Sequence, residues 1–358
     1  MSVRVALAGL GWAGRELWLP LLREHGGFEV VAAVDADPVA RAAFGEATGI
    51  AVHPAVDALT AGAVDLAVVA VPNHLHVEVA GALLAAGIPV FLEKPVCLTS
   101  AEADILAAAE RGGGMLLAGS AARYRGDVQA LGRVVPDLGD VRHVDLAWVR
   151  ARGVPRPGGW FTRRDRAGGG ALLDLGWHLL DTLAFLLGPA RVTQVAGVTS
   201  DDFVNLDAWR AAWRRDRSGA VAADVEDTAR GFLVRDDGVS VSLRTGWASH
   251  EARDVSLIRV EGSAGTAELR CTFGFSPNRE PEPVLTVTRE GTTTRLAVPA
   301  EEIGVEYRRQ LDALAAMLAD PGNRGRAVAA ARPIVHVIEN FYASARSARA
   351  RRAEPAFQ

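Results

Sequence analysis

The sequence predicts an α/β protein of two domains, in which a parallel β-sheet covered by helices is followed by a large, mostly antiparallel open sheet. The chain has 358 residues, more than one typical domain needs. Its first third alternates short apolar runs with helical patterns, and its later part holds a series of alternating strands separated by turns. We place the boundary so that the domains cover residues 1–122 and 123–358.

Strands and helices follow each other regularly in the first domain. Strands are predicted at 3–8, 28–34, 64–71, 89–92 and 115–118, and helices after Gly14, from Pro38, at 77–86 and at 100–110. Glycines at the helix ends, such as Gly87, and Pro38 in a first helical turn support these limits. Because these largely apolar strands alternate with helices, we expect a parallel sheet buried on both faces.

A glycine-rich turn after the first strand carries the strongest local signal. Gly9, Gly11 and Gly14 follow a strand and open a helix, and Asp35 ends the next strand. This context indicates a Rossmann dinucleotide-binding domain, with the helix N-terminus at Trp12 and Ala13 facing the phosphates. Asp35 is expected to accept hydrogen bonds from the adenosine ribose. Its carboxylate would repel a 2′-phosphate, so NAD is favoured over NADP.

The second signal is a lysine. Of 39 basic side chains only Lys94 is lysine, and arginine fills every other position. The bias of the coding genome explains such a composition as well as a special role does. Pro72-Asn73 and Glu93-Lys94-Pro95, however, lie at the carboxyl ends of predicted strands, where ligands bind in open α/β sheets. This position favours a functional lysine, since an ammonium is compact and can give up its proton.

The second domain is predicted to carry a polar stripe on an apolar helix. Asp174, His178 and Asp181 are spaced to share one helix face. A capping aspartate and a satisfied core histidine would explain the first two without function. The glycines at 168–170 favour a helix start pressed against a flat ligand. Strands are expected at 141–150, 231–234, 239–245, 254–261, 266–271, 284–288 and 294–298, and helices at 305–319 and 327–347.

Composition excludes several classes of function. With a net charge of −4, the chain has no basic excess for nucleic acid. No apolar run approaches the length that would span a bilayer, and the N-terminus lacks a secretory pattern, so we expect a cytoplasmic protein with no membrane partner. Cys97 and Cys271 lack metal-ligand spacing, and no metal is predicted.

These motifs together resemble the glucose–fructose oxidoreductase/inositol dehydrogenase family (Gfo/Idh/MocA). The matching motifs include the glycine turn after the first strand with Asp35, and Trp160 before the glycines at 168–170. The motif Gly262-Ser263-Ala264-Gly265 also matches. The resemblance implies a catalytic set of Lys94, Asp174 and His178. The residues expected to bind the cofactor are Gly9, Gly11, Trp12, Ala13, Gly14, Asp35, Pro72, Asn73, His76, Glu93, Arg123 and Trp160. It also implies a homodimer or homotetramer formed through the open sheet.

The expected function is therefore an NAD-dependent oxidoreductase acting on a secondary alcohol or ketone of a sugar, sugar derivative or cyclitol. His178 is the natural general base, Lys94 donates to the substrate oxygen, and Asp174 orients the hydroxyl or the imidazole. An NAD-dependent glycoside hydrolase using transient oxidation is the alternative, and a non-catalytic sugar sensor a more remote one.

Three further features bear on the substrate. The residue before Arg123 is a small alanine, which argues against a simple inositol. The stretch 200–223 is longer than expected, and we interpret it as surface or interface rather than substrate contact. The six arginines within 150–166 would suit an anionic substrate, although most are expected to be solvated.

Overall fold

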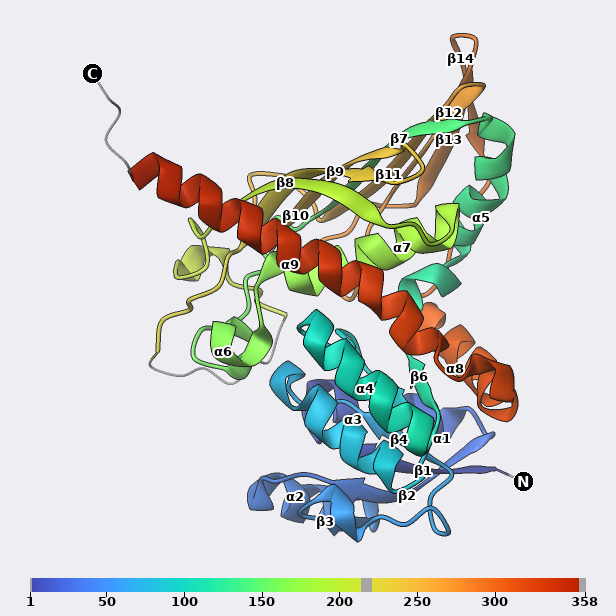
Figure 1. Ribbon diagram of the computed structural model, residues 1–358, viewed down its shortest axis with the longest axis vertical. Coiled ribbons are helices and arrows are strands. Elements are labelled where there is room, and N and C mark those ends of the chain that lie inside the picture. Colours follow the sequence, from blue (N-terminus) through green and yellow to red (C-terminus); the bar gives the residue numbers. More distant parts are fainter. Residues whose placement is uncertain (1, 214–220, 354–358) are drawn as a thin grey trace. The chain divides into compact units, whose positions relative to one another are not determined.

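The computed structural model describes residues 2–213 and 221–353 and divides into two compact units (Figure 1). The first unit contains Met1–Ala121 and Tyr307–Arg332, and the second contains Ala122–Glu306 and Pro333–Gln358. The first unit thus takes up a late segment that a single linear boundary does not anticipate.

A six-stranded parallel sheet forms the centre of the first unit, in the order β3-β2-β1-β4-β5-β6. The strands are β1 (Val3–Ala8), β2 (Phe28–Val34), β3 (Ala51–His53), β4 (Leu66–Val69), β5 (Val90–Leu92) and β6 (Leu116–Ala118). The helices are α1 (Leu19–Glu24), α2 (Pro38–Thr48), α3 (His76–Ala85) and α4 (Ser100–Gly112), and α3 and α4 pack against each other. All of β4 and β5 is buried, which explains their uninterrupted apolar sequences. The predicted parallel sheet is confirmed.

An eight-stranded sheet dominates the second unit, in the order β14-β13-β12-β11-β7-β10-β9-β8. Its strands are β7 (Val141–Val149), β8 (Val192–Ser200), β9 (Thr228–Arg235), β10 (Ser240–Gly246), β11 (Val255–Gly262), β12 (Gly265–Cys271), β13 (Val284–Arg289) and β14 (Thr292–Leu296). Strands β7 and β10 pair in parallel, whereas the other neighbours pair antiparallel. The predicted mostly antiparallel sheet is therefore confirmed.

The register of this sheet separates a covered face from an open one. Leu146 and Trp148 of β7 are buried on the face that meets the helix α7 (Trp177–Leu187), as are Leu243 and Thr245 of β10. Side chains between them, such as Arg244, point to the opposite face and are more exposed. The period of two along each strand therefore places Trp148 and Thr245 on the same side as the polar helix.

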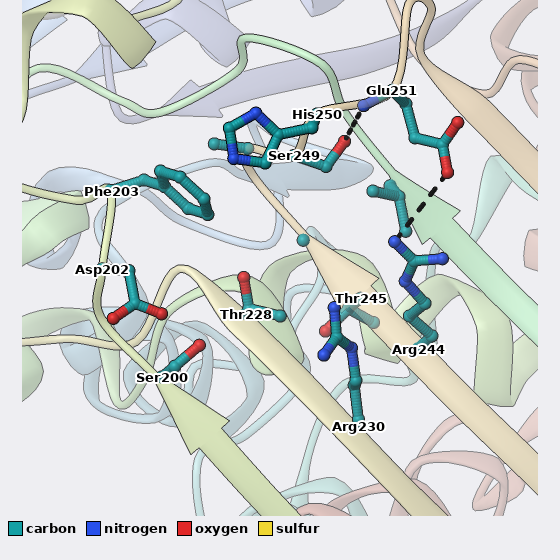
Figure 2. A pocket seen from close by; sticks show the side chains of 13 residues that line it. Ser200, Asp202, Phe203, Thr228, Arg230, Arg244, Thr245, Ser249, His250 and Glu251 are labelled. Atoms are coloured by element: carbon teal, nitrogen blue, oxygen red, sulfur yellow. Dashed lines mark hydrogen bonds and ion pairs between the residues drawn. The ribbon is translucent and has the colours of Figure 1, made fainter.

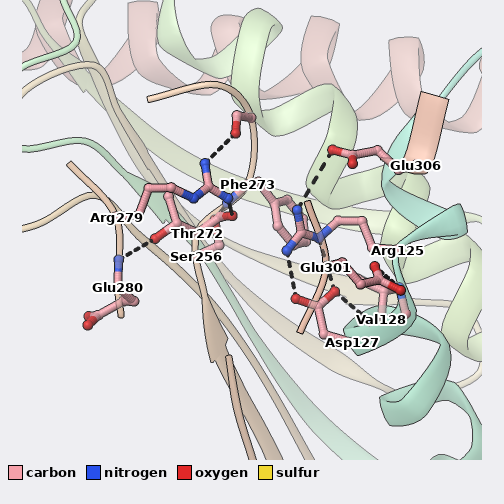
Figure 3. A network of polar contacts seen from close by, with 12 residues as sticks. Arg125, Asp127, Val128, Ser256, Thr272, Phe273, Arg279, Glu280, Glu301 and Glu306 are labelled. Carbon is pink, nitrogen blue, oxygen red and sulfur yellow. Dashed lines mark hydrogen bonds and ion pairs between the residues drawn. The ribbon is translucent and has the colours of Figure 1, made fainter. Parts of the chain in front are cut away.

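A network of polar contacts lies at the start of the helix α5 (Gly126–Val134) and in the segment after β12 (Figure 3). The Arg125 guanidinium donates to both oxygens of Asp127 at 3.0 and 2.7 Å, and its centre lies 4.7 Å from the Phe273 ring. Arg279 donates to the carbonyl of Thr272 at 2.6 Å. Burial alone would lower the pKa of Arg125, but Asp127 and Glu306 hold it above its ordinary value.

The late segment returns to the first unit through α8 (Val305–Ala319) and the start of α9 (Arg326–Ala353). Tyr307 packs edge-on against Trp18, and the backbone N–H of Gly325 donates to the buried carboxylate of Glu110 at 3.0 Å. These contacts join residues about 200 or more positions apart in sequence, which local patterns do not report.

Some sequence expectations differ from the structure. The strands β3 and β8 and the helix α5 were not predicted. The strand β3 is only three residues long, and β8 is largely exposed.

The expectation that no run could span a bilayer also has one exception. Among the described residues, those at 164–187 form a helical segment that could span a bilayer by length and composition, but 67% of its apolar window is buried, as expected of a core helix.

Candidate functional site

The loop after β1 combines two glycines that have no room for a side chain with one that has open space. A Cβ on Gly9, which has φ +98°, would lie 2.6 Å from the carbonyl oxygen of Ala70, and one on Gly14 would lie 2.0 Å from that of Gly9. A Cβ on Gly11 would have no atom of the described residues within 4 Å, apart from those of its two chain neighbours. The backbone is thus tightly packed at both ends and open in the middle, which fits the close approach of a dinucleotide pyrophosphate.

A helical segment begins directly after this loop. Residues Ala13–Trp18 form a π-helical turn that continues into α1, and Trp12 before it is 49% exposed. The start of a helix carries a partial positive charge, which favours an anion. The predicted phosphate contact at Trp12 and Ala13 is compatible with this geometry and stays a prediction.

Asp35 links the end of β2 to the glycine loop through hydrogen bonds. Its carboxylate accepts hydrogen bonds from the backbone N–H of Leu10 at 2.7 Å and of Asp37 at 2.8 Å. A carboxylate has about four lone-pair sites, so two bonds leave acceptor capacity for ribose hydroxyls. The proposed ribose contact therefore shares this side chain with a structural role.

His76 connects the loops that follow β4 and β5. The ring nitrogens of His76 lie 2.7 Å from the carbonyl oxygen of Pro95 and 2.9 Å from that of Val71. Burial lowers the pKa of His76 to about 4, so the ring is neutral near pH 7 and donates to one of these carbonyls at a time. His76 thus has a clear structural role, whereas its predicted contact with a cofactor has no direct support.

Glu93 receives two donors from its own unit. The indole N–H of Trp18 donates to it at 2.8 Å, and the backbone N–H of Lys94 at 3.0 Å. Burial raises the pKa of Glu93 despite the neighbouring Lys94 charge. The helix after the glycine loop is thereby linked to the segment that carries Lys94, which is itself partly buried. Pro72 and the buried Asn73 belong to the same unit.

The second unit holds Asp174 and His178 on a continuous helical segment. Asp174 lies in a π-helical turn, Leu172–Gly176, and His178 in α7. The indole N–H of Trp247 donates to Asp174 Oδ2 at 2.9 Å, and the Trp148 ring centre lies 5.5 Å from that of His178. His178 is 8% exposed. Sequence patterns did not indicate the role of Trp247, because it is 73 positions away from Asp174.

Arg123, predicted to bind the cofactor, has a partner within the second unit. Its guanidinium donates to both carboxylate oxygens of Asp181, the third member of the predicted polar stripe. Burial would lower the pKa of Arg123, but Asp181 raises it above its ordinary value. This ion pair gives Asp181 a structural function.

The predicted role of the glycine run before the helix needs correction. A Cβ on Gly169 would lie 1.9 Å from the Tyr342 hydroxyl, and one on Gly170 would lie 1.8 Å from the carbonyl oxygen of Glu226. Glu226, which is 1% exposed, also accepts from the backbone N–H groups of Gly170 and Leu172. Packing of the protein against itself, rather than a flat ligand, accounts for these two glycines.

Aromatic rings connect Trp160 with Asp174. Trp160 packs edge-on against Phe161 at 5.1 Å between ring centres, and Phe161 stacks on Trp247 at 5.7 Å. Trp247 in turn binds Asp174. The Trp160 segment is therefore part of the shell around Asp174, while its predicted cofactor contact stays a prediction.

A hollow of about 380 Å³ lies at the end of the second sheet on its open face (Figure 2). Phe203, His250, Arg230 and Arg244 line it together with Asp202 and Glu251, and Arg244 lies 3.9 Å from the Glu251 carboxylate. The long segment predicted at 200–223 supplies Phe203 and, in an adjoining hollow, Trp209. These two rings and His250 pack together, so the described part of that segment belongs to the body of the second unit; residues 214–220 lie outside the described range.

The arginines of the 150–166 segment behave in two ways. Arg150 is 6% exposed, with its guanidinium between the Trp148 and Trp213 rings. Four others are exposed, as expected for solvated side chains: Arg152, Arg156, Arg164 and Arg166.

Within residues 2–213 and 221–353, no cluster of three or more His, Cys, Asp or Glu residues could hold a metal ion.

Comparisons with known proteins match both units. Residues 3–119 match the model of an oxidoreductase family with an NAD-binding Rossmann fold (GFO/IDH/MocA), and residues 136–268 match the GFO/IDH/MocA C-terminal domain. The chain is 80% identical over 358 residues, 100% of both chains, to the "Putative UDP-kanosamine synthase oxidoreductase subunit" of Amycolatopsis mediterranei (strain S699). It is 30% identical to the D-apiose dehydrogenase of Paraburkholderia graminis, over 82% of this chain and 72% of the relative.

Solved structures share the fold. GenD2 from gentamicin A biosynthesis, in complex with NAD, has a TM-score of 0.75 at 24% identity over 97% of this chain and 95% of its own. A mutant of KijD10, a 3-ketoreductase from Actinomadura kijaniata in complex with TDP-benzene and NADP, has a TM-score of 0.72 at 19% identity over 96% and 98%. Both family models and the full-length relative agree with the resemblance seen in the motifs, and the chain belongs to the GFO/IDH/MocA family of oxidoreductases.

Proposed function

We propose that this protein is an NAD-dependent dehydrogenase that oxidises the 3-hydroxyl of a UDP-linked glucose to a ketone. The 80% identity along the whole chain to a protein named as the oxidoreductase subunit of a UDP-kanosamine synthase carries this proposal. Kanosamine is glucose with an amino group in place of the 3-hydroxyl. Its synthesis from glucose therefore calls for a ketone at that carbon, followed by amination, and we assign the amination to a separate subunit.

Incubation with NAD and a panel of sugars tests this activity. We expect NADH to form with UDP-glucose and to stay at background with free glucose and myo-inositol. Because oxidation of an alcohol by NAD is uphill, a carbonyl-trapping reagent is added in every assay. NADH formation with inositol but not with UDP-glucose would overturn the assignment. Sugar cleavage without net NADH would instead favour the glycoside hydrolase.

Three residues of the chain have distinct proposed roles in the reaction. NAD, when bound, accepts the hydride that leaves the substrate carbon. We assign to His178 the removal of the hydroxyl proton, since histidine is the side chain that most often acts as a general base. Lys94 donates a hydrogen bond to the same oxygen as its negative charge grows, and Asp174 orients the substrate hydroxyl or the imidazole.

The open backbone at Gly11 provides a test of cofactor binding. In Gly11→Ala the new methyl has room in the free protein but lies where we place the pyrophosphate. We expect thermal stability to change little and the Kd for NAD to rise about tenfold or more. Gly14→Ala is the matched control, because its Cβ collides with the carbonyl of Gly9 and should reduce stability itself. Unchanged NAD affinity in Gly11→Ala would place the cofactor elsewhere.

The same titration tests cofactor preference. Asp35 at the end of β2 would face the 2′-phosphate of NADP, and two like charges at such a distance repel. We therefore expect NADP to bind at least about tenfold more weakly than NAD. Equal affinities would show that Asp35 does not face the ribose.

We also propose that the protein works in the cytoplasm as a homodimer or homotetramer. The open face of the second sheet carries exposed apolar side chains, including Val198 and Phe232, which are 50% and 46% exposed. Burial of such residues favours association. Sedimentation of the purified protein at micromolar concentration should give a dimer or tetramer, and a monomer would contradict this.

A further inference from the structure

Trp247 makes one hydrogen bond with its side chain, and that bond goes to Asp174. The residue follows β10 directly and is fully buried, at 0% exposure. Its indole N–H donates to Asp174 Oδ2 at 2.9 Å. An indole has one donor and no acceptor, so its whole hydrogen-bonding capacity is used on this carboxylate.

The position of the indole is fixed on several sides. The backbone N–H of Trp247 donates to the carbonyl of Asp227 at 2.8 Å, and its carbonyl accepts from Gly153 at 2.7 Å. Its ring stacks on Phe161 with an angle of 29° between the planes. A side chain with two rotatable bonds, held in this way, presents its donor at a constant point in space.

Asp174 itself lies on a less regular element. The turn Leu172–Gly176 is π-helical, a form that interrupts α-helices and is frequent at functional sites. A carboxylate on such a turn can rotate about its side-chain bonds unless a neighbour holds it. The bond from the Trp247 indole holds Oδ2 at a fixed point and thereby restricts rotation of the carboxylate.

We infer that Trp247 is a positioning residue for the reaction, which holds the Asp174 carboxylate in the orientation that turnover needs. This inference rests on the proposed catalytic role of Asp174. It assigns to Trp247 no contact with substrate or cofactor. Removal of the indole N–H should therefore slow turnover while leaving the binding of both ligands almost unchanged.

The first variant is Trp247→Phe, assayed with UDP-glucose and NAD. We expect kcat to fall about 10- to 100-fold, by analogy with the loss caused when the hydrogen-bond partner of a metal-binding side chain is removed. KM for the sugar nucleotide and Kd for NAD should stay within about threefold. Trp209→Phe is the matched control, since that ring lies in the hollow beside Phe203 and His250, and its kcat should stay within about twofold.

A double-mutant cycle separates positioning from packing. If Trp247 acts only through Asp174, then Trp247→Phe/Asp174→Asn should be no more than about twofold slower than Asp174→Asn alone. Multiplied losses would overturn the inference, and so would a kcat for Trp247→Phe within twofold of the parent. Because a smaller ring can disturb folding, the second variant replaces Trp247 with benzothienylalanine, which keeps the shape and lacks the N–H. The same fall in kcat is expected for it.

The two proposals fail in different ways. An Asp174→Asn protein with parental kcat would remove the catalytic role of Asp174, and the proposed mechanism with it. A large loss in Asp174→Asn together with an unaffected benzothienylalanine variant would leave the mechanism standing and refute the role of Trp247.

Discussion

Replacing Lys94 with arginine is expected to lower kcat by about 100-fold or more while the Kd for NAD changes less than about threefold. Both side chains are cationic, so an electrostatic role alone would survive the change. A guanidinium, however, is larger, planar and unable to give up a proton. Lys94 is partly buried at the carboxyl end of β5, beside Glu93, where a larger side chain cannot place a single donor in the same position.

The control for Lys94 uses the opposite exchange. Arg4 forms a partly exposed ion pair with Asp65 at 2.8 Å, and Arg4→Lys should leave kcat unchanged because such pairs contribute little. Steady-state kinetics and NAD titration of both variants measure the two quantities compared, kcat and the Kd for NAD. If Lys94→Arg keeps turnover within a few-fold of the parent, its status as the chain's only lysine reflects composition and not chemistry.

Replacing His178 with alanine is expected to lower kcat by about 100- to 10,000-fold, the usual contribution of a general base. His178 is nearly buried beside Trp148, so its ring has a defined position in the second unit. We expect the Kd for NAD to stay within about threefold, because the proposed nucleotide contacts belong to the first unit.

Two controls accompany this experiment: thermal unfolding checks the stability of the variant, and a substitution of a second histidine, His250, serves as the comparison. His250→Ala removes a ring from the hollow at the end of the second sheet and should leave kcat within about twofold. A loss of NAD affinity in His178→Ala as large as its loss of kcat would argue against a role as the base.

The sequence predicted much of the fold because its strands are strongly patterned. The mostly apolar runs predicted β1 and β2 with the limits that the structure shows, and the helix α8 was also predicted at its observed limits. The short, partly exposed β3 has no such pattern, and β8 alternates too weakly to stand out. The return of residues 307–332 to the first unit depends on contacts with distant residues such as Glu110.

The sequence predicted which residues form the candidate site, but it did not predict which distant residues contact them. Gly9, Gly11 and Gly14 have a recognisable spacing, and the structure gives each a distinct steric environment. The bond from Trp247 to Asp174 had no local signal, because the two lie on different elements. The run at 168–170 was assigned to a ligand for the same reason, since Tyr342 and Glu226 approach it from far along the chain.

Deuterium transfer from the sugar tests the central claim most directly. UDP-glucose labelled with deuterium at carbon 3 is incubated with the protein and NAD, and the nicotinamide product is analysed by mass spectrometry. If the protein oxidises the 3-hydroxyl, the NADH formed carries the deuterium, and His178→Ala forms almost none. NADH without the label, or label retained in the sugar at full turnover, would contradict oxidation at that carbon.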